Sequence, residues 1–176
     1  MKPIEIKTPI SKEILSQLKI GQQVLLSGTI YTARDAAHKK LTEAMKNGVD
    51  VGFDVTDQII YYAGPCPAKP GSPIGPVGPT TSGRMDAYTP YLLDSGLSAM
   101  IGKGYRSPAV KESIVKNGAV YFAAIGGAAA VIMKCVKEVE LVAFEELGPE
   151  AIRKLTIEKM PLVVAVDSFG GDVYGG

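Results

Sequence analysis

The sequence is poor in the residues that hold metals and disulfides. It contains two cysteines, Cys66 and Cys135, and one histidine, His38, among 176 residues. Two distant cysteines do not build the disulfide framework of a small secreted protein, and this favours a cytoplasmic location. Even together with His38 they fall short of the usual ligand set of an iron–sulfur cluster or a structural zinc site. We therefore expect no metal centre within this chain, so a metal cofactor would need ligands from another chain.

An excess of charge of either sign is also missing. The chain has 19 Lys and Arg against 18 Asp and Glu, a net charge of +1, which excludes a broad basic field for nucleic acid. The longest uncharged apolar stretch, residues 119–133, contains Gly126 and Gly127 and is shorter than the ~20 residues that span a bilayer. The N-terminus lacks the apolar core of a signal peptide. We expect a soluble protein that binds neither nucleic acid nor membranes.

The length and the pattern of elements predict one α/β domain over residues 1–176 with a mixed sheet. A strand is expected over residues 22–32, bent at Gly28, and a helix follows over residues 33–45. Ser107 and Gly118 are typical of the start and the end of a second helix. Further strands are predicted over residues 4–10, 59–63, 97–101, 119–124, 136–144, 152–160 and 162–166. Further helices are predicted after Ser11, over residues 84–94 and, as a buried alanine-rich helix, over residues 127–135.

Residues 64–82 form a long segment rich in glycine and proline, with six prolines. Such a composition suits a flexible linker between domains. The flanking segments are too short to be separate domains, however, and the segment ends in the polar run GPTTSGRMD, residues 78–86. Long loops inside compact domains are usually functional, so we interpret this segment as a binding loop.

The end of this loop has the composition of an anion-binding site. Thr80, Thr81 and Arg84 stand where a helix is predicted to begin, and free N–H groups and the helix dipole favour negative charge there. An arginine in the first turn opposes the dipole, so we expect Arg84 to serve a ligand, and a carboxylate suits its planar fork. The two threonines are alternatively simple helix caps.

Two further cations stand just after predicted strands, where α/β sheets place their binding sites. Arg34 follows the first long strand and begins a helix, and Lys103 lies between two glycines that let the backbone approach a ligand closely. A threonine hydroxyl is a weak base unless neighbouring cations stabilise its alkoxide. Arg34, Arg84 and Lys103 together would be such neighbours for Thr80.

Other polar residues near these positions carry weaker signals. His38 lies one turn into the first long predicted helix and is either a structural hydrogen-bonding residue or a donor to substrate. Gly126 and Gly127 precede a predicted helix and either supply N–H groups to an anion or allow close packing. Asp35 and Lys39 are spaced as an ordinary surface ion pair. The residues by themselves thus predict a site for a small polyanion such as a di-acid, without a Ser/His/Asp triad or a nucleotide-binding P-loop.

At these positions the chain closely resembles a known family, the β subunit or C-terminal domain of the class I iron–sulfur hydro-lyases fumarate hydratase and L(+)-tartrate dehydratase. The resemblance covers almost the whole chain, and its motifs are long and in order. They are TARDAAHKK (residues 32–40), IIYYAGPCP (59–67), GPVGPTTSGRMDAY (75–88), GKGYRS (102–107), YFAAIGGAAAVI (121–132) and ELGPEAI (146–152).

The resemblance implies the swivelling β/β/α fold of this family, a three-layer arrangement. It implies a [4Fe–4S] cluster held by three cysteines of a separate α subunit, in a hetero-oligomer with two copies of each chain. Because the chain begins at Met1 with no upstream domain, we expect the two-subunit arrangement rather than the fused one.

The resemblance also implies roles for individual residues. It assigns the grip on the dicarboxylate to Arg34, Arg84 and Lys103, and the base that removes a proton next to a carboxylate to Thr80. An aspartate of the other chain would be the acid. Thr81 matches the same motif and is placed with the substrate-binding residues, whereas His38, Gly126 and Gly127 match without a firm role.

Three functions remain open at this point. The leading one is the β subunit of a fumarate hydratase, which reversibly hydrates fumarate to L-malate. The nearest alternative is the β subunit of L(+)-tartrate dehydratase, with the same mechanism and a more hydroxylated substrate. The third is a non-catalytic carboxylate-binding or assembly module, in which Arg84 and Thr80 matter for binding but no partner confers turnover.

Overall fold

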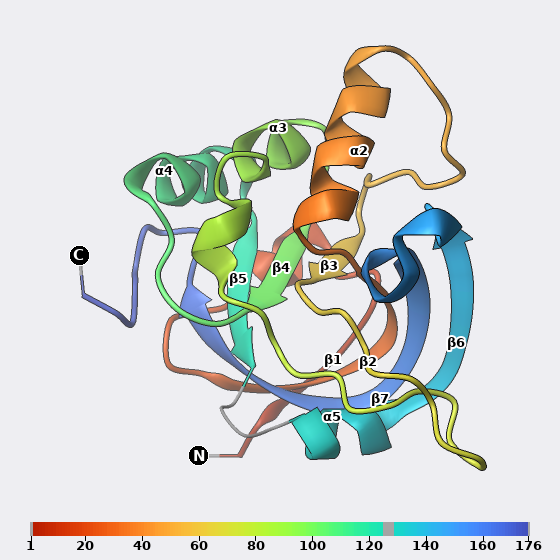
Figure 1. The fold of residues 1–176 in the computed structure, drawn as a ribbon. Coiled ribbons are helices and arrows are strands. Elements are labelled where there is room, and N and C mark those ends of the chain that lie inside the picture. The colour runs from red at the N-terminus through yellow and green to blue at the C-terminus, as the bar shows by residue number, and fades with distance from the viewer. Residues whose placement is uncertain (1, 125–128, 176) are drawn as a thin grey trace.

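A mixed sheet of seven strands forms the centre of the computed structural model, which describes residues 2–124 and 129–175. The strands are β1 (Ile4–Lys7), β2 (Gln23–Thr32), β3 (Ile59–Tyr61), β4 (Ala99–Gly102), β5 (Val120–Ala124), β6 (Val136–Ala143) and β7 (Ile152–Val166). Their order is β1-β2-β3-β4-β5-β7-β6, and β2 also pairs with β7. Strands β2, β3, β4, β5 and β7 thus close on one another, and the sheet is a partly closed barrel (Figure 1).

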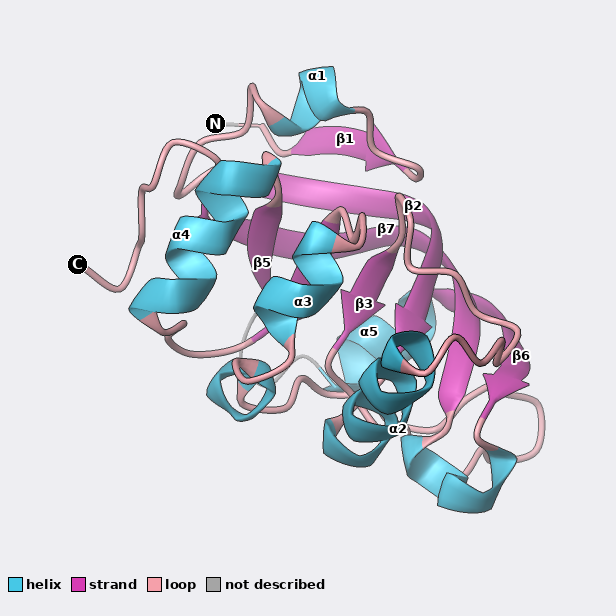
Figure 2. Ribbon diagram, turned by 90° about the horizontal axis from the view of Figure 1, so that it is seen from above, coloured by secondary structure: helices cyan, strands magenta, loops and turns pink. Residues whose placement is uncertain are grey.

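The strands β2, β3, β4 and β5 are parallel neighbours, so their carboxyl ends lie at the same edge of the sheet. Parallel strands need crossover connections, which helices usually supply. Here α2 (Asp35–Lys46) joins β2 to β3, α3 (Thr89–Asp94) joins β3 to β4, and α4 (Pro108–Asn117) joins β4 to β5. The three helices lie together on one face of the sheet (Figure 2).

The central strands are buried on both faces, because the barrel closes over one face and the helices cover the other. Ile59 and Phe122 belong to the apolar cluster that the barrel encloses, and their neighbours Ile60 and Tyr121 belong to the cluster beneath the helices. All four side chains are almost completely buried. Burial of such a side chain stabilises the fold by roughly 1.5–3 kcal/mol. The two apolar clusters therefore fix the parallel strands and the sheet edge at which they end.

Local signals predict several boundaries correctly. The Ser107 hydroxyl accepts a hydrogen bond from the N–H of Val110 at the start of α4, and Gly118 ends that helix in the left-handed conformation, with φ 62°. Ser11 caps the short helix α1 (Lys12–Leu15) in the same way. The predicted bend at Gly28 is confirmed, because the pairing of β2 with β7 shifts register there.

Other predicted boundaries are wrong. The two last predicted strands are one, β7, because Pro161 lies in the stretch between the residues that pair with β6 and those that pair with β5. Pro161 has no N–H to donate. On the side of β7 that faces β5 and β6, no described strand pairs with it, so no hydrogen bond between strands is lost there. Strand β6 lies at the outer edge of the sheet. The short 3₁₀ segment η2 (Glu145–Glu150) connects it to β7.

The two remaining helix predictions are also corrected. The helix expected over residues 84–94 is a short 3₁₀ turn, η1 (Ser82–Met85), followed by α3, because Pro90 suits the first turn of a new helix. The predicted buried helix over residues 127–135 is α5 (Ala129–Cys135), in which Ile132 is buried but Val131 is 51% exposed. Over residues 2–124 and 129–175 no helix is both long and apolar enough to cross a membrane.

Candidate functional site

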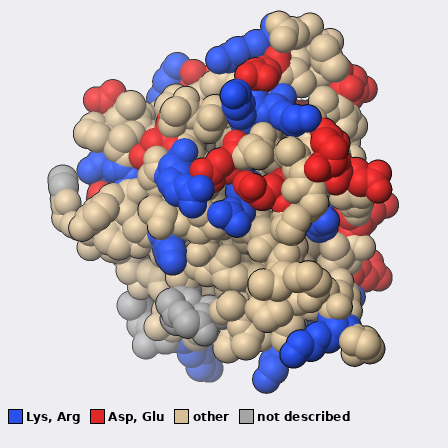
Figure 3. Space-filling view, viewed as in Figure 1, with Lys and Arg blue, Asp and Glu red and all other residues tan. Residues whose placement is uncertain are grey.

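The predicted site residues converge at the carboxyl ends of the parallel strands. Arg34 follows β2, and Lys103 follows β4 directly and is exposed. We use "the candidate site" for Arg34, Thr80, Thr81, Arg84 and Lys103. Gly126 and Gly127 lie outside the described residues. Charged side chains of both signs adjoin one another near the middle of the face in Figure 3.

Backbone hydrogen bonds fix the end of the long loop between β3 and β4. The N–H of Thr80 donates to the carbonyl of Tyr62 at 2.7 Å, one residue past β3. Thr81 forms an isolated parallel bridge with Lys103, and the N–H of Ser82 donates to the Lys103 carbonyl at 2.9 Å. The loop is therefore part of the domain rather than a linker, and it brings both threonines next to Lys103.

The predicted anion site lacks the helix N-terminus that the sequence predicted for it. Thr81 stands before η1, a 3₁₀ helix of four residues, and its side chain makes no capping hydrogen bond. The simple-cap alternative therefore lacks support for Thr81. A single turn supplies little macrodipole, so the attraction for an anion rests on the side chains of Arg34, Arg84 and Lys103.

Arg84 is paired with an acidic residue of the same chain. Its Nε donates to Oδ2 of Asp35 at 2.9 Å, and its Nη2 forms an ion-pair contact of 2.6 Å with the same oxygen. The side chains of Arg84 and Asp35 are 52% and 36% exposed. The predicted surface pair of Asp35 with Lys39 is wrong. Asp35 stands in the first turn of α2, and side chains of a helix lean towards its N-terminus, which here faces η1.

Arg34 reaches the candidate site because Gly64, three residues past the end of β3, has no side chain. It precedes α2, and its side chain lies over Gly64, where an added Cβ would come within 3.0 Å of Arg34 Cδ. The Arg34 Nε is buried and, within the described residues, has no hydrogen-bond partner. Buried donors are normally satisfied, so this group is available to a ligand or a water molecule.

His38 is a buried residue that contacts the backbone of Arg34. The ring is fully buried, and Nδ1 lies 2.8 Å from the carbonyl oxygen of Arg34. A carbonyl only accepts, so Nδ1 carries the hydrogen and Nε2, which has no partner within the described residues, carries the lone pair. Burial lowers the pKa of His38 to about 4, and the nearby charge of Arg106 acts in the same direction. His38 is therefore neutral near pH 7 and holds the backbone of Arg34.

Arg106 is a buried charge that sequence reasoning missed. Its Nε donates to Oδ1 of Asp86 at 2.8 Å, and its Nη2 donates to the hydroxyls of Tyr62 and Thr89 at 3.1 and 2.9 Å. The guanidinium also lies over the rings of Tyr62 and Tyr121, at 5.1 and 4.8 Å from their centroids. A lone arginine before a capped helix is usually exposed, and only its place in the motif GKGYRS pointed to it.

Tyr121 links the loop that contains Ser82 to the loop that contains Gly104. Its hydroxyl lies 2.6 Å from the Ser82 hydroxyl and donates to the Gly104 carbonyl at 3.0 Å. Burial raises the pKa of Tyr121, so the phenol stays protonated. The Ser82 hydroxyl occupies the place where a side chain at Gly102 would begin. A glycine at this point is therefore required for the loops to approach.

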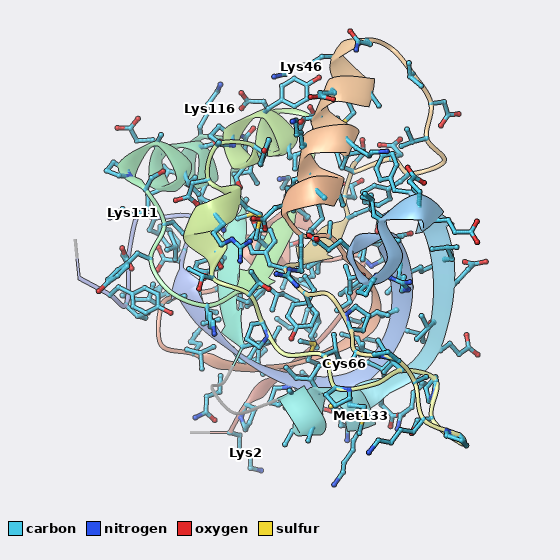
Figure 4. All side chains as sticks on the ribbon, viewed as in Figure 1. Lys2, Lys46, Cys66, Lys111, Lys116 and Met133 are labelled. Atoms are coloured by element: carbon cyan, nitrogen blue, oxygen red, sulfur yellow. The ribbon has the colours of Figure 1, made fainter. Side chains whose placement is uncertain are left out.

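The two cysteines, both among the described residues, do not provide the ligand set of an iron–sulfur cluster. Cys66 is exposed in the long loop, and Cys135 is half-buried in α5 near Met133 (Figure 4 labels Cys66 and Met133). Burial raises the pKa of the Cys135 thiol, which disfavours the thiolate that binds metals. Among residues 2–124 and 129–175, no group of three or more His, Cys, Asp or Glu is arranged to hold a metal ion.

Comparisons with known proteins match this chain to one family and to proteins of that family. A family model described as Fumarase C-terminus matches residues 1–176. The chain is 41% identical over 175 residues to Fumarate hydratase 2 of Leishmania major, covering 97% of this chain and 31% of that protein. It is 42% identical over 176 residues to the anaerobic class I fumarate hydratase of Escherichia coli K12, covering 97% of this chain and 32% of that protein.

A third relative is of nearly the same length as this chain. It is the putative L(+)-tartrate dehydratase subunit beta of Methanocaldococcus jannaschii, 40% identical over 171 residues, which covers 94% of this chain and 88% of that protein. The chain spans about a third of the length of the fumarate hydratases named above. By the match over its whole length, this chain belongs to the Fumarase C-terminus family.

Proposed function

We propose that this chain is the β subunit of an iron–sulfur-dependent hydro-lyase that reversibly hydrates fumarate to L-malate. The observation that carries the proposal is the convergence of Arg34, Arg84 and Lys103 with Thr80 at the carboxyl ends of parallel strands. The family match and the fumarate hydratase relatives support it. The proposal includes the family's swivelling three-layer fold, a cytoplasmic location, and an assembly with two copies of each chain.

The cations would bind and stabilise the dicarboxylate. In the dehydration direction a proton leaves a carbon next to a carboxylate, and negative charge builds on that carboxylate in the transition state. A bidentate arginine and a lysine at this place stabilise the transition state more than the ground state. Arg84 and Lys103 are exposed, which leaves both in reach of a substrate from solvent.

Thr80 would accept the proton. Its backbone is held by the Tyr62 carbonyl, and its side chain is half-buried. A hydroxyl becomes an effective base only where cations lower the energy of its alkoxide, and Lys103, Arg84 and Arg34 would provide that field. Thr81, which pairs with Lys103, would complete the substrate contacts.

The proposed [4Fe–4S] cluster belongs to a separate α subunit. The two cysteines of this chain lie on different elements, one in a loop and one in α5, and do not form a cluster ligand set. The chain named subunit beta among the relatives supports a partner that carries the missing ligands.

A second function is favoured by one specific observation. The relative whose length matches this chain is named as a putative L(+)-tartrate dehydratase subunit beta. Tartrate carries one more hydroxyl than malate, and a site selects for such a group with a few polar contacts. The same cations and Thr80 would serve either substrate.

Anaerobic co-expression with the candidate α chain tests both functions. Fumarate hydration and L(+)-tartrate dehydration are measured side by side, with each chain omitted in turn as the control. We expect turnover of fumarate that needs both chains. Turnover of tartrate alone would replace the leading proposal by the second. A stable complex with an intact cluster that converts neither substrate would contradict both and leave the carboxylate-binding module.

A further inference from the structure

One cation of the candidate site is held by a carboxylate of its own chain. Arg84 donates a hydrogen bond from Nε to Oδ2 of Asp35 at 2.9 Å, and its Nη2 lies 2.6 Å from the same oxygen in an ion pair. Within the described residues no hydrogen bond from Nη1 is found. A guanidinium offers two edges to planar acceptors. Asp35 therefore occupies the Nε edge and leaves the edge formed by Nη1 and Nη2 to another carboxylate.

The position of Asp35 links two distant parts of the site. It follows Arg34 directly at the start of α2, whereas Arg84 lies 49 residues further along the chain in η1. The ion pair thus sets where the guanidinium of Arg84 lies relative to Arg34. A long arginine side chain that is 52% exposed samples many rotamers without such a contact.

The ion pair is not arranged for maximal stability. Oδ1 of Asp35 is buried and has no partner within the described residues, although a carboxylate commonly receives a guanidinium with both oxygens. A single-oxygen contact between half-exposed groups contributes little to folding, commonly under about 1 kcal/mol. The contact is therefore better explained by the orientation that it gives to Arg84.

We propose that Asp35 is a positioning residue, which holds the Nε edge of Arg84 so that its Nη1–Nη2 edge faces a substrate carboxylate. This rests on the proposed function, because it assigns a role toward the same dicarboxylate. The opposite role is that of a competitor, which occupies Arg84 until substrate displaces it. The two roles predict opposite signs, because removing an orienting group weakens substrate binding and removing a competing charge strengthens it.

The test uses the complex of both chains and three substitutions. Asp35→Asn removes the charge, Asp35→Glu keeps the charge but moves it, and Glu13→Gln is the control, since Glu13 stands in the first turn of α1 away from the site. The readouts are kcat and KM for L-malate, and the dissociation constant of succinate by calorimetry. We expect Asp35→Asn to raise both the dissociation constant of succinate and the KM for L-malate by about tenfold. Asp35→Glu should recover part of this loss. Glu13→Gln should change neither the dissociation constant nor KM.

A double-mutant cycle separates positioning from a general structural effect. In an Arg84→Ala background, Asp35→Asn should add no further loss of succinate affinity, because the group that it orients is gone. Equal losses in both backgrounds would overturn the proposal. Unchanged or tighter succinate binding in Asp35→Asn alone would also overturn it and favour the competitor.

The outcome distinguishes this proposal from the proposed function. If the unsubstituted complex converts fumarate or tartrate and Asp35→Asn behaves like it, the positioning role alone is wrong. If the unsubstituted complex neither binds succinate nor converts either substrate, the proposed function is wrong, and the role of Asp35 falls with it.

Discussion

Arg106 and Asp86 form an ion pair in which the arginine side chain is fully buried, with Nε donating to Oδ1 at 2.8 Å. Oδ2 of Asp86 also accepts the N–H of Ser107 at 2.8 Å. Burial opposes the charge of Arg106, but the neighbouring Tyr62, Asp86 and Tyr121 outweigh it and raise the pKa of Arg106. This pair therefore holds together the two loops that carry the candidate site.

Asp86→Ala should destabilise the protein by about 3–5 kcal/mol, because it leaves the buried guanidinium of Arg106 without its counter-charge. The free energy of unfolding in urea measures the change. Lys116→Ala is the matched control, since it removes an exposed ion pair with Asp94 and should cost under about 1 kcal/mol. Similar losses in the two variants would contradict the assignment of a buried structural charge.

The buried His38 should make stability depend on pH. Its pKa is about 4 in the folded protein and 6.5 as a free side chain, so the unfolded chain binds more protons between these values. The free energy of unfolding should therefore fall as the pH drops from 6.5 to 4, by on the order of 3 kcal/mol. Above pH 6.5 His38 should contribute no slope.

His38→Asn isolates this contribution, because an asparagine amide keeps a donor for the Arg34 carbonyl but does not titrate. Thermal unfolding of both proteins across pH 4 to 7 gives the difference in slope. Groups other than residue 38 that titrate in the same range are present in both proteins, so the comparison cancels them. Parallel curves for the two proteins would show that His38 is not held neutral.

Gly102→Ala should disturb the packing of Ser82 and Tyr62 next to the candidate site. The new Cβ would displace the Ser82 hydroxyl and lie 2.7 Å from Cδ2 of Tyr62. Overpacking of this kind costs about 1–3 kcal/mol, and the shift of Ser82 should also lower turnover. Gly83→Ala in the same region is the control, because its Cβ would meet nothing closer than 4.0 Å. Equal stability of the two variants would argue against a close contact at Gly102.

Thr80→Ala should abolish most turnover while largely keeping dicarboxylate binding. Loss of a general base lowers kcat by about 10²–10⁴-fold, and the cations that bind substrate remain. Steady-state kinetics of the two-chain complex and succinate calorimetry measure the two effects. Thr80→Ser keeps the hydroxyl and should retain part of the turnover. Normal kcat in Thr80→Ala would remove Thr80 as the base.

Arg84→Lys should weaken dicarboxylate binding, because a lysine keeps the charge but loses the planar fork. We expect the dissociation constant of succinate to rise by about tenfold, with a larger fall in kcat/KM than in kcat. The exposed Lys116→Ala serves again as a control without effect on binding. An affinity equal to that of the unsubstituted complex would show that Arg84 acts as a point charge only.

Local chemistry explains which parts of the fold could be predicted. Ser107 and Gly118 bound α4 because capping and left-handed backbone need only neighbouring residues. The composition of the loop after β3 predicts a binding role, and its attachment to the domain through Thr80 and Ser82 is seen in the structure. The boundary at Pro161 failed, because a proline is tolerated in a strand where no neighbouring strand needs its N–H. Pro161 pairs with Leu25 of β2 on one side, but on the other side it lies between the residues that pair with β6 and those that pair with β5.

The sequence by itself determined the family and where the residues of the candidate site stand relative to the strands, because strand ends and turn residues are local features. Only the tertiary structure decided which of these residues meet. The choice of Arg84 rather than Lys39 as the partner of Asp35, and the burial of Arg106 against Asp86, arise from segments far apart in the chain. Such pairs depend on how parallel strands and their crossovers align, which no local pattern records.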